Sequence, residues 1–402
     1  MNTPNMSNVN IRVLTDSSAL TSIAEVWDSL LQRAGEDIPI YFTYEWIATW
    51  WKYFGEGKKL NILLIENEHE VVGIIPLMQI NYRLGLLKLS TLETIGLECN
   101  NCVALVSSGN TEDVITVFLK YLDDKLIKRN TILRLTPVAE NNEFIELLRR
   151  RMQQTSKTLL IYECLTNLAP YVSLPHSYDA YLKSLSGNRR EHSRRSLRDL
   201  QEAHTVEFQQ STCEDLEDRL DKLFELHQKR WQETSSHRWF SNPAVRGFYR
   251  DIALQFFKKG WLYFSSLLID NEIASVEYGY IYINKLYCQI NARDTSYAKY
   301  SIGHLHTLHT IKDAIDSGLK ECDFLIGYHP HKLRWTKSAR RHLEITIVKR
   351  GLWTKLHLKL FYIFLRLYEI KQNGLRESYH LRRLKKRNEK ELKKMGLAKT
   401  II

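Results

Sequence analysis

The stretch that decides the fold is residues 285–335, KLYCQINARDTSYAKYSIGHLHTLHTIKDAIDSGLKECDFLIGYHPHKLRW. Residues 285–291 alternate in the manner of a β-strand, and Ser301-Ile302-Gly303 then begins a helix that extends to about residue 317. A second strand is expected at residues 321–326. A strand that leads into a helix with a small, glycine-containing first turn favours a bound phosphate, because that turn presents free N–H groups and the positive end of the helix dipole.

Two more strands are predicted upstream, at residues 262–270 and 272–283, joined by a tight turn at Asp270-Asn271. The order is therefore strand, strand, strand, helix, strand. The segment closes with the pattern D-F-x-x-G-x(4)-K-x-x-W, formed by Asp323, Phe324, Gly327, Lys332 and Trp335. The order resembles the acyl-CoA-binding half of a GNAT acetyltransferase. The closing pattern resembles the BioF2-like branch, which includes CelD-type proteins once named for cellulose biosynthesis.

The first half of the chain repeats this order. Helices are predicted at residues 23–34 and 44–54, then strands at 60–65, 71–80 and near 102–106, a helix at 112–126, a strand at 131–135 and a helix at 143–152. The second half is preceded by helical segments of its own. These are residues 177–203, as one long helix or two, 213–232 and 243–259.

The sequence therefore predicts a mixed α/β (α+β) fold with two tandem GNAT-like domains, each a mixed, mainly antiparallel sheet flanked by helices. Residues 1–170 are expected to be structural or to shape the acceptor pocket, because the window at residues 107–111 lacks the cradle spacing. Residues 171–350 are expected to bind acyl-CoA, and residues 351–402 to form a basic helical tail. Tandem halves of this kind also resemble the Fem aminoacyltransferases, which add amino acids to cell-wall precursors.

The composition is ordinary for a soluble globular protein, with 44% hydrophobic and 26% charged residues. The first residues, MNTPNMSNVN, lack the basic and apolar regions of a secretory signal. The best apolar segment, residues 358–368, is too short to span a membrane and is interrupted by charges. Six scattered cysteines are too few for a disulfide scaffold in 402 residues. We therefore expect a cytoplasmic protein.

The net charge of +11 is concentrated in the tail. Residues 351–402 contain 14 Lys and Arg against 4 Glu, and the first 350 residues contain 43 basic and 42 acidic groups. The nearly neutral body counts against a nucleic-acid partner. The tail helix is expected to pack on the body, and contact of this basic amphipathic segment with an anionic membrane is the alternative.

The GNAT resemblance implies acetyl-CoA, or another acyl-CoA, as co-substrate. The family's pyrophosphate cradle reads Q/R-x-x-G-x-G/A, and the matching window is residues 298–303, AKYSIG. Gly303 fits this pattern, whereas Ala298 replaces the expected cationic or amide residue, so backbone N–H groups would do most of the binding. An ordinary helix start is the alternative interpretation. The expected donor-binding residues are Lys299, Ser301, Ile302, Gly303 and His304.

The chemistry that the resemblance implies needs a base for the proton of the attacking amine. Glu277 is one candidate, because apolar neighbours in its strand would raise its pKa towards neutrality, although alternation could equally place it on a solvated face. Asp323 is another candidate, and capping of a turn is its alternative role. Tyr328, in the loop after the last strand, would return a proton to the CoA thiolate.

Basic residues are expected to hold a negatively charged acceptor. Arg190, Arg194 and Arg198 are spaced four apart and form one cationic stripe on a helix, with a solvated face as the alternative. Such a stripe suits an anionic sugar or the phosphates of CoA. Lys332 and Trp335 would face one way on a helix, and Trp335 could also be a core residue. The expected acceptor-binding residues are Arg190, Arg194, Arg230, Lys332 and Trp335.

No metal is expected. Cys99 and Cys102 form a single C-x-x-C without the second pair that a zinc site needs. His304 and His306 are two residues apart and point in nearly opposite directions on a helix, so they do not converge on an ion. The histidine cluster therefore does not predict a metal site.

The function expected from the resemblance is an N-acyltransferase that moves an acetyl or small acyl group from acyl-CoA to an amine, such as an amino sugar in polysaccharide or envelope biosynthesis. One alternative is a Fem-like transferase that takes its aminoacyl group from charged tRNA. Another is a non-catalytic binding module docked by its basic tail.

Overall fold

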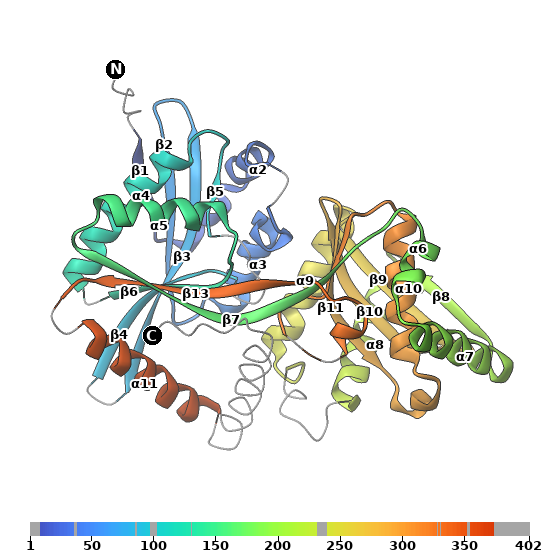
Figure 1. Ribbon diagram of the computed structural model, residues 1–402. Coiled ribbons are helices and arrows are strands. Elements are labelled where there is room, and N and C mark those ends of the chain that lie inside the picture. Colours follow the sequence, from blue (N-terminus) through green and yellow to red (C-terminus); the bar gives the residue numbers. More distant parts are fainter. Residues whose placement is uncertain are drawn as a thin grey trace. The chain divides into compact units, whose positions relative to one another are not determined.

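The computed structural model describes residues 9–35, 38–84, 87–96, 103–129, 131–230, 239–327, 329, 331–351 and 354–373. The chain divides into two compact units. Unit 1 comprises Met1–Asn167 and Arg341–Ile402, and unit 2 comprises Leu168–Arg340. Each unit holds strands flanked by helices (Figure 1).

The sheet of unit 1 is mixed and mainly antiparallel. Its strand order is β1 (Asn10–Leu14), β2 (Lys59–Glu66), β3 (Val71–Leu84), β4 (Leu87–Thr94), β6 (Thr131–Ala139) and β13 (Ala339–Lys349), and the short β5 (Leu105–Val106) pairs with β3. Neighbouring strands are antiparallel except β4 and β6, which are parallel. A helical crossover joins that parallel pair, as a parallel connection requires.

Helices cover both faces of this sheet. They are α1 (Ser17–Thr21), α2 (Ala24–Arg33), the 3₁₀ turn η1 (Ile40–Phe42), α3 (Tyr44–Phe54), α4 (Thr111–Arg129), α5 (Glu143–Thr155) and α11 (Thr354–Asn373). Leu133 and Leu135 of β6 share a core with α4 and α5, whereas Ile132 packs against α11. Because successive strand residues point to opposite faces, α11 lies on the face opposite α4 and α5.

Unit 2 has its own sheet, in the order β7 (Leu159–Ser173), β12 (Glu321–Asp323), β11 (Lys285–Arg293), β10 (Glu272–Tyr282), β9 (Leu262–Ile269) and β8 (Val206–Gln210). The residues of β7 from Leu168 onwards belong to this unit. Only β11 and β12 are parallel. The helix between them is α10 (Ile302–Asp316), so unit 2 repeats the connection of unit 1.

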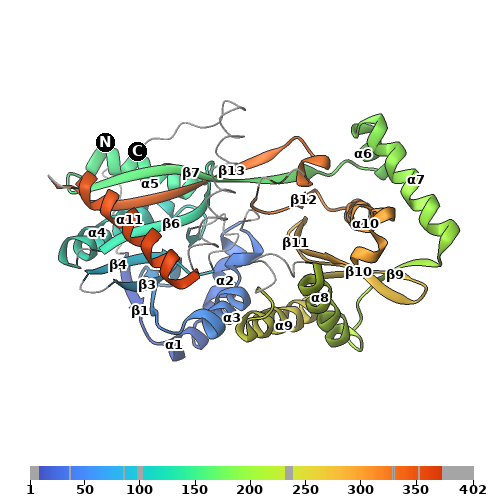
Figure 2. The ribbon, with the colours of Figure 1, turned by 90° about the horizontal axis from the view of Figure 1, so that it is seen from below.

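The other helices of unit 2 are α6 (Tyr178–Ser184), α7 (Gly187–Ala203), α8 (Leu216–Arg230) and α9 (Pro243–Lys258). Figure 2 shows α8 and α9 on one side of the sheet and α10 on the other. The segment expected as one long helix or two is two, α6 and α7, because Leu185 and Ser186 adopt extended backbone between them.

The structure confirms the predicted fold class and the order of strands and helices around α10. The strand predicted near residues 102–106 is present as the two-residue β5, but the prediction missed the longer strand before it, β4. Three of its buried residues, Thr91, Glu93 and Thr94, are polar and lie on both sides of the buried Leu92, so its sequence lacks a clear apolar alternation. Strand β13 was not predicted either. It pairs with β6, and residues 341–350 therefore belong to unit 1.

The tail carries the predicted helix, α11. No helix in the described part of the chain has the length and apolar character needed to cross a membrane.

Candidate functional site

The two parallel strands of unit 2 separate soon after they meet. Strand β12 pairs with β11 only from Lys285 to Tyr287, whereas β11 continues to Arg293. After β12 the chain follows β7 instead, and the N–H group of Phe324 donates to the carbonyl of Pro170 at 3.0 Å. Within the described residues, β11 therefore has no strand partner on this edge after Tyr287. Such an edge can pair with an extended ligand through the backbone.

A kink in the chain begins this separation. Leu325 has φ of 59°, a left-handed conformation that costs a residue with a Cβ atom about 1–2 kcal/mol. Asp323 Oδ1 accepts the Leu325 N–H at 2.7 Å, and Lys332 Nζ donates to the carbonyls of Leu325 at 3.2 Å and Ile326 at 2.9 Å. Two residues of the closing sequence pattern thus hold the kink from both sides.

Both carboxylate oxygens of Asp323 have partners. Asp323 is 2% exposed, and its Oδ2 accepts from Arg340 Nη1 at 3.0 Å. Burial raises the pKa of Asp323 to about 6, against the attraction of the Arg340 guanidinium. Arg340 also pairs with Glu321 and stacks over the Tyr171 ring, 4.0 Å from its centre. This arrangement favours a structural role for Asp323, and a role as base stays a prediction.

We expect Asp323→Asn to destabilise the protein by roughly 3 kcal/mol, because it removes the buried carboxylate from the pair and leaves the half-buried Arg340 without one of its two carboxylates. The free energy of unfolding in urea measures this. Asp316→Asn, which removes an exposed pair with Lys312 on α10, should change it by no more than about 1 kcal/mol. An unchanged stability, combined with loss of the pH dependence of catalysis, would instead identify Asp323 as the base.

The first turn of α10 lies next to this free edge. The chain leaves β11 through a 3₁₀ segment, η3 (Thr295–Tyr300), and reverses at Ser301, which has φ of 55°. The carbonyl of Ser301 accepts the N–H groups of His304 and Leu305, and its side chain does not cap the helix. The first N–H groups of a helix have no partner within it, so those of Ile302 and Gly303 are oriented for an anion.

Arg293, the last residue of β11, packs directly on this turn. A Cβ atom at Gly303 would lie 2.6 Å from Arg293 Nη1 and 2.7 Å from its Cδ, so the glycine provides the room that the guanidinium occupies. Burial lowers the pKa of Arg293, as does the nearby charge of Arg334. A cation at the positive end of a helix is unfavourable by itself. An anion bound between them would be attracted by both.

We expect Gly303→Ala to change stability differently in two backgrounds. In an Arg293→Ala protein, the new methyl group meets no guanidinium, and the higher helix propensity of alanine should raise stability by up to ~1 kcal/mol. In the wild-type background the methyl group collides with Arg293, and the gain should disappear. Thermal unfolding of the four proteins in this double-mutant cycle measures the coupling. Equal effects in both backgrounds would contradict the contact.

Glu277 lies on the same face of the sheet as Arg293. Its Oε2 accepts from Asn291 Nδ2 at 2.6 Å, and Asn291 and Arg293 are two residues apart on β11. Glu277 is 3% exposed, and burial raises its pKa to about 7, an effect that Asn291, Arg230 and Arg293 partly offset. A carboxylate with a pKa near neutrality beside an open strand edge can accept a proton from a bound molecule.

Arg230 is a third cation of this site, in addition to Arg293 and Arg334. It ends α8, and its Nη1 donates to the carbonyl of Asn291 at 3.0 Å. Burial lowers the pKa of Arg230 to about 10, with a further contribution from Arg293. Sequence reasoning selected Arg230 but missed Arg293. The only sequence feature that could have indicated Arg293 was its position between the third strand and the predicted cradle.

Comparison with known proteins finds a family match within unit 2. The sequence model for the acetyltransferase (GNAT) domain matches residues 187–333. This part of the chain is similar to a GNAT domain. No curated protein matches the sequence.

Solved structures extend the similarity to both units. FemX has a TM-score of 0.57 at 11% identity, and the match covers 87% of this chain and all of FemX. A conserved protein of unknown function from Bacteroides thetaiotaomicron has a TM-score of 0.52 at 12% identity, covering 84% of this chain and all of the other. At these identities the matches establish the fold alone.

His304 and Trp335 pack together within the GNAT domain. Their rings stack with centres 4.6 Å apart, and His304 Nε2 lies 2.7 Å from Ser193 Oγ of α7. Burial, together with the charges of nearby His192 and arginines, lowers the pKa of His304 to about 4, so the ring is neutral at physiological pH. Trp335 is buried in a core cluster. The side chain of His304 is thus used within the protein, and its N–H group already donates to the carbonyl of Ser301.

The arginines of α7 have separate surroundings. Arg190 Nη1 donates to the carbonyls of Leu185 at 2.6 Å and Lys183 at 3.1 Å, at the end of α6, so it caps that helix. Arg194 is exposed. Lys299 is also exposed, with its ammonium group 4.6 Å from the centre of the Tyr300 ring. These positions do not bring Arg190 to the donor turn, and acceptor binding by either arginine stays a prediction.

Three sequence candidates lie outside the described residues: Tyr328, Cys99 and Cys102. Among described side chains, no three His, Cys, Asp or Glu are grouped to hold a metal ion. His306 instead bridges two serines, with Nδ1 3.0 Å from Ser275 Oγ and Nε2 3.2 Å from Ser265 Oγ.

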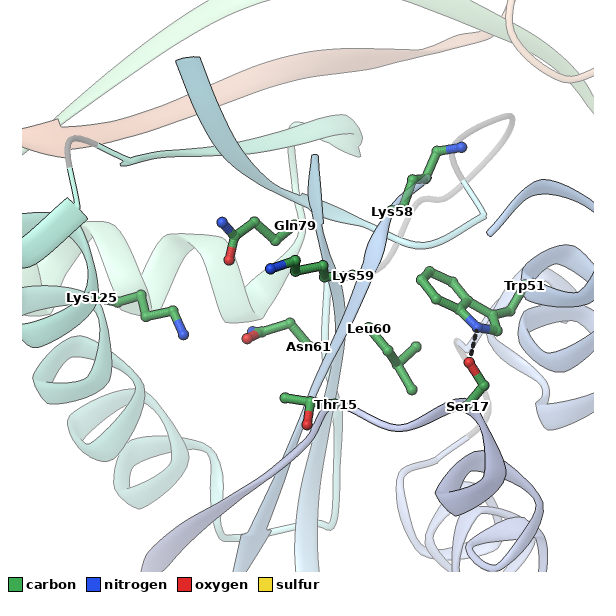
Figure 3. A pocket seen from close by; sticks show the side chains of 9 residues that line it. All are labelled: Thr15, Ser17, Trp51, Lys58, Lys59, Leu60, Asn61, Gln79 and Lys125. Carbon is green, nitrogen blue, oxygen red and sulfur yellow. Dashed lines mark hydrogen bonds between the residues drawn. The ribbon is translucent and has the colours of Figure 1, made fainter. Parts of the chain in front are cut away.

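Two cavities lie elsewhere and are not lined by the residues around Glu277 and Gly303. One, of about 260 Å³ in unit 1, is drawn in Figure 3, where Lys59, Lys125 and Gln79 converge and Lys58 points away. The other, of about 440 Å³ in unit 2, is lined by Asp313 and other residues near the far end of α10. Neither is lined by Glu277 or Gly303. The candidate site of the GNAT domain is therefore a strand edge and a helix end.

Proposed function

We propose that this protein is an N-acyltransferase that moves an acetyl or other small acyl group from acyl-CoA to an amine. The observation that carries the proposal is the position of Arg293 against Gly303, where a free strand edge meets the first turn of α10. A guanidinium and a helix N-terminus directed at one place suit a pyrophosphate. The adjoining edge of β11 suits a chain with amide groups, such as pantetheine.

The donor would be held mainly by the backbone. Ile302 and Gly303 supply N–H groups, and Arg293 supplies the cation that the sequence window lacks at Ala298. Arg230 and Arg334 contribute further positive charge. Lys299 is exposed and free to reach a phosphate at the surface. The thioester of acyl-CoA supplies an activated carbonyl carbon.

Glu277 is the base in this proposal. The amine nitrogen forms a bond to the thioester carbonyl carbon, the carbon–sulfur bond breaks, and Glu277 takes the proton that the nitrogen loses. Tyr328, or solvent, returns a proton to the CoA thiolate. A carboxyl group with a pKa of about 7 is partly ionised at physiological pH and can accept this proton. Asp323 is the less favoured base, because both of its oxygens already accept hydrogen bonds.

The acceptor proposed from the BioF2-like resemblance is an amino sugar of polysaccharide or envelope biosynthesis. Arg194 is available to bind its negative charge, since its side chain is exposed. Lys332 contacts the carbonyls of the kink, so its contribution would be to shape the site. Unit 1 is proposed to be structural or to serve the acceptor. The expected setting is cytoplasmic.

The similarity to FemX over both units favours a second candidate, transfer of an aminoacyl group. The two candidate functions differ in the molecule that donates the transferred group. The acyl-CoA enzyme uses the free edge of β11 and the turn at Gly303, whereas an aminoacyl-tRNA donor would require a broad basic surface. The nearly neutral first 350 residues favour acyl-CoA.

Release of thiol from acetyl-CoA tests the proposal, with the purified chain and a panel of amino sugars, including nucleotide-linked ones. We expect acceptor-dependent release that Glu277→Gln abolishes. Glu93→Gln, which alters a buried carboxylate of unit 1, should leave release unchanged in folded protein. Transfer from aminoacyl-tRNA without any from acetyl-CoA would establish the second candidate. Activity with neither donor would favour a binding module.

A further inference from the structure

Helix α11 has apolar side chains on two faces. The inner face packs on the sheet of unit 1, where Leu358 and Phe361 form a buried cluster with Ile132 and Val348. Phe364 is buried on the same side. A surface helix usually needs one such apolar stripe, and the opposite face is normally polar.

The outer face of α11 does not follow this rule. Leu360 is 52% exposed, Ile363 is 52% exposed and Leu367 is 46% exposed. Their spacing of three and four residues places them in one stripe along the helix. Among the described residues, six large hydrophobic side chains are exposed, and α11 carries four of them, with Tyr362 as the fourth. An exposed apolar group of this kind marks an interaction surface.

Cationic residues flank the stripe. Lys359 and Arg366 are exposed and lie within about 60° of Ile363 around the helix axis. The sequence that follows, residues 374–402, contains ten Lys and Arg against three Glu. This charge would repel a second copy of the same face. It complements a surface of negative charge that is apolar just beneath, which describes an anionic lipid bilayer.

We propose that the outer face of α11 docks on an anionic membrane surface. Leu360, Ile363 and Leu367 would enter the region between headgroups and acyl chains, with the helix parallel to the membrane plane. Lys359 and Arg366 would extend to the lipid phosphates. The basic residues after Asn373 would add attraction that depends on charge alone. The proposal is independent of the acyltransferase chemistry, because it uses no residue of the GNAT domain.

Sedimentation of the full-length protein with vesicles tests it, using phosphatidylcholine alone and with about one third phosphatidylserine. The test variant is Leu360→Ser, Ile363→Ser, Leu367→Ser. All three side chains are exposed, so the fold should survive, and circular dichroism checks this. Leu254→Ser is the control, since Leu254 is an exposed leucine on α9, outside the stripe.

We expect wild type and Leu254→Ser to bind the anionic vesicles, and the triple variant to bind at least ~10-fold more weakly. Replacing Lys385, Lys386 and Arg387 by glutamine in the full chain should weaken binding and make it less sensitive to salt. Binding that the triple variant retains in full would assign lipid attraction to the tail alone and overturn the proposal. Absence of binding by wild type would also overturn it, and a dimer that the triple variant lacks would identify a second copy as the occupant.

Discussion

Glu277→Gln is expected to lower kcat by about 10²- to 10⁴-fold, the range for loss of a general base. Glutamine keeps the size of the side chain and its contact with Asn291 but cannot take the proton of an ammonium group. KM for acetyl-CoA should change little, because Glu277 is not among the groups proposed to hold the donor. Steady-state rates with saturating acceptor measure the effect. A variant that retains full activity would show that the base lies elsewhere.

The pH dependence gives a second test of Glu277. Because its pKa in the folded protein is about 7, the activity of wild type should rise with pH through that value, and the rise should be missing in Glu277→Gln. Stability should show the reverse trend. A carboxyl group whose pKa is raised on folding holds its proton longer in the folded state, so wild-type stability falls as pH increases from about 4.5 to about 7.

Glu277→Gln should remove this part of the pH dependence. Relative to wild type, the glutamine variant should therefore become more stable as pH rises from 5 to 8, by roughly 3 kcal/mol at most. Urea unfolding at the two pH values measures the difference. For the pH dependence of activity, the control is Glu93→Gln, whose effect on activity should be the same at every pH.

Arg293→Ala is expected to weaken acetyl-CoA binding by about 10- to 100-fold, which corresponds to the loss of a charge-assisted hydrogen bond to a phosphate. The effect should be smaller at high salt, because the interaction is electrostatic. Arg198→Ala is the matched control, since Arg198 is exposed on α7 and its carboxylate neighbours are surface residues.

The stability of the free protein separates a binding role of Arg293 from a structural one. The guanidinium is partly buried against the positive end of α10, and burial lowers its pKa. Its removal should therefore leave the free energy of unfolding unchanged or higher. A large loss of stability would show that Arg293 holds the fold, and weaker binding would then not report on the donor site.

The regular elements of this chain are predictable from sequence because their side-chain periodicity is unambiguous. Helix α3 has the predicted bounds, residues 44–54. Its Trp46 and Trp50 are four residues apart, and both are buried. The turn between β9 and β10 follows from Asp270-Asn271, whose φ angles of 52° and 68° suit these two residues. Strand β13 was not predicted, although Leu343, Ile345 and Ile347 alternate with polar residues as in a strand; the burial of those polar residues, His342, Glu344 and Thr346, is visible only in the structure.

The site was less predictable because it depends on contacts between distant elements. Gly303 could be recognised, but the reason for it, the Arg293 side chain, is known only once β11 and α10 are placed together. Asp323 and Lys332 were assigned chemistry from their sequence pattern, yet they bind the backbone of a left-handed leucine. Nothing in a leucine indicates that conformation.

A calorimetric titration with acetyl-CoA shows whether the donor binds at the first turn of α10. The wild-type chain should bind it with micromolar affinity, and Gly303→Glu should not bind, because the new side chain displaces Arg293 and puts a carboxylate where the pyrophosphate would lie. Absence of heat at millimolar acetyl-CoA from a folded wild-type chain, or equal affinity in the variant, would contradict a donor site at the first turn of α10.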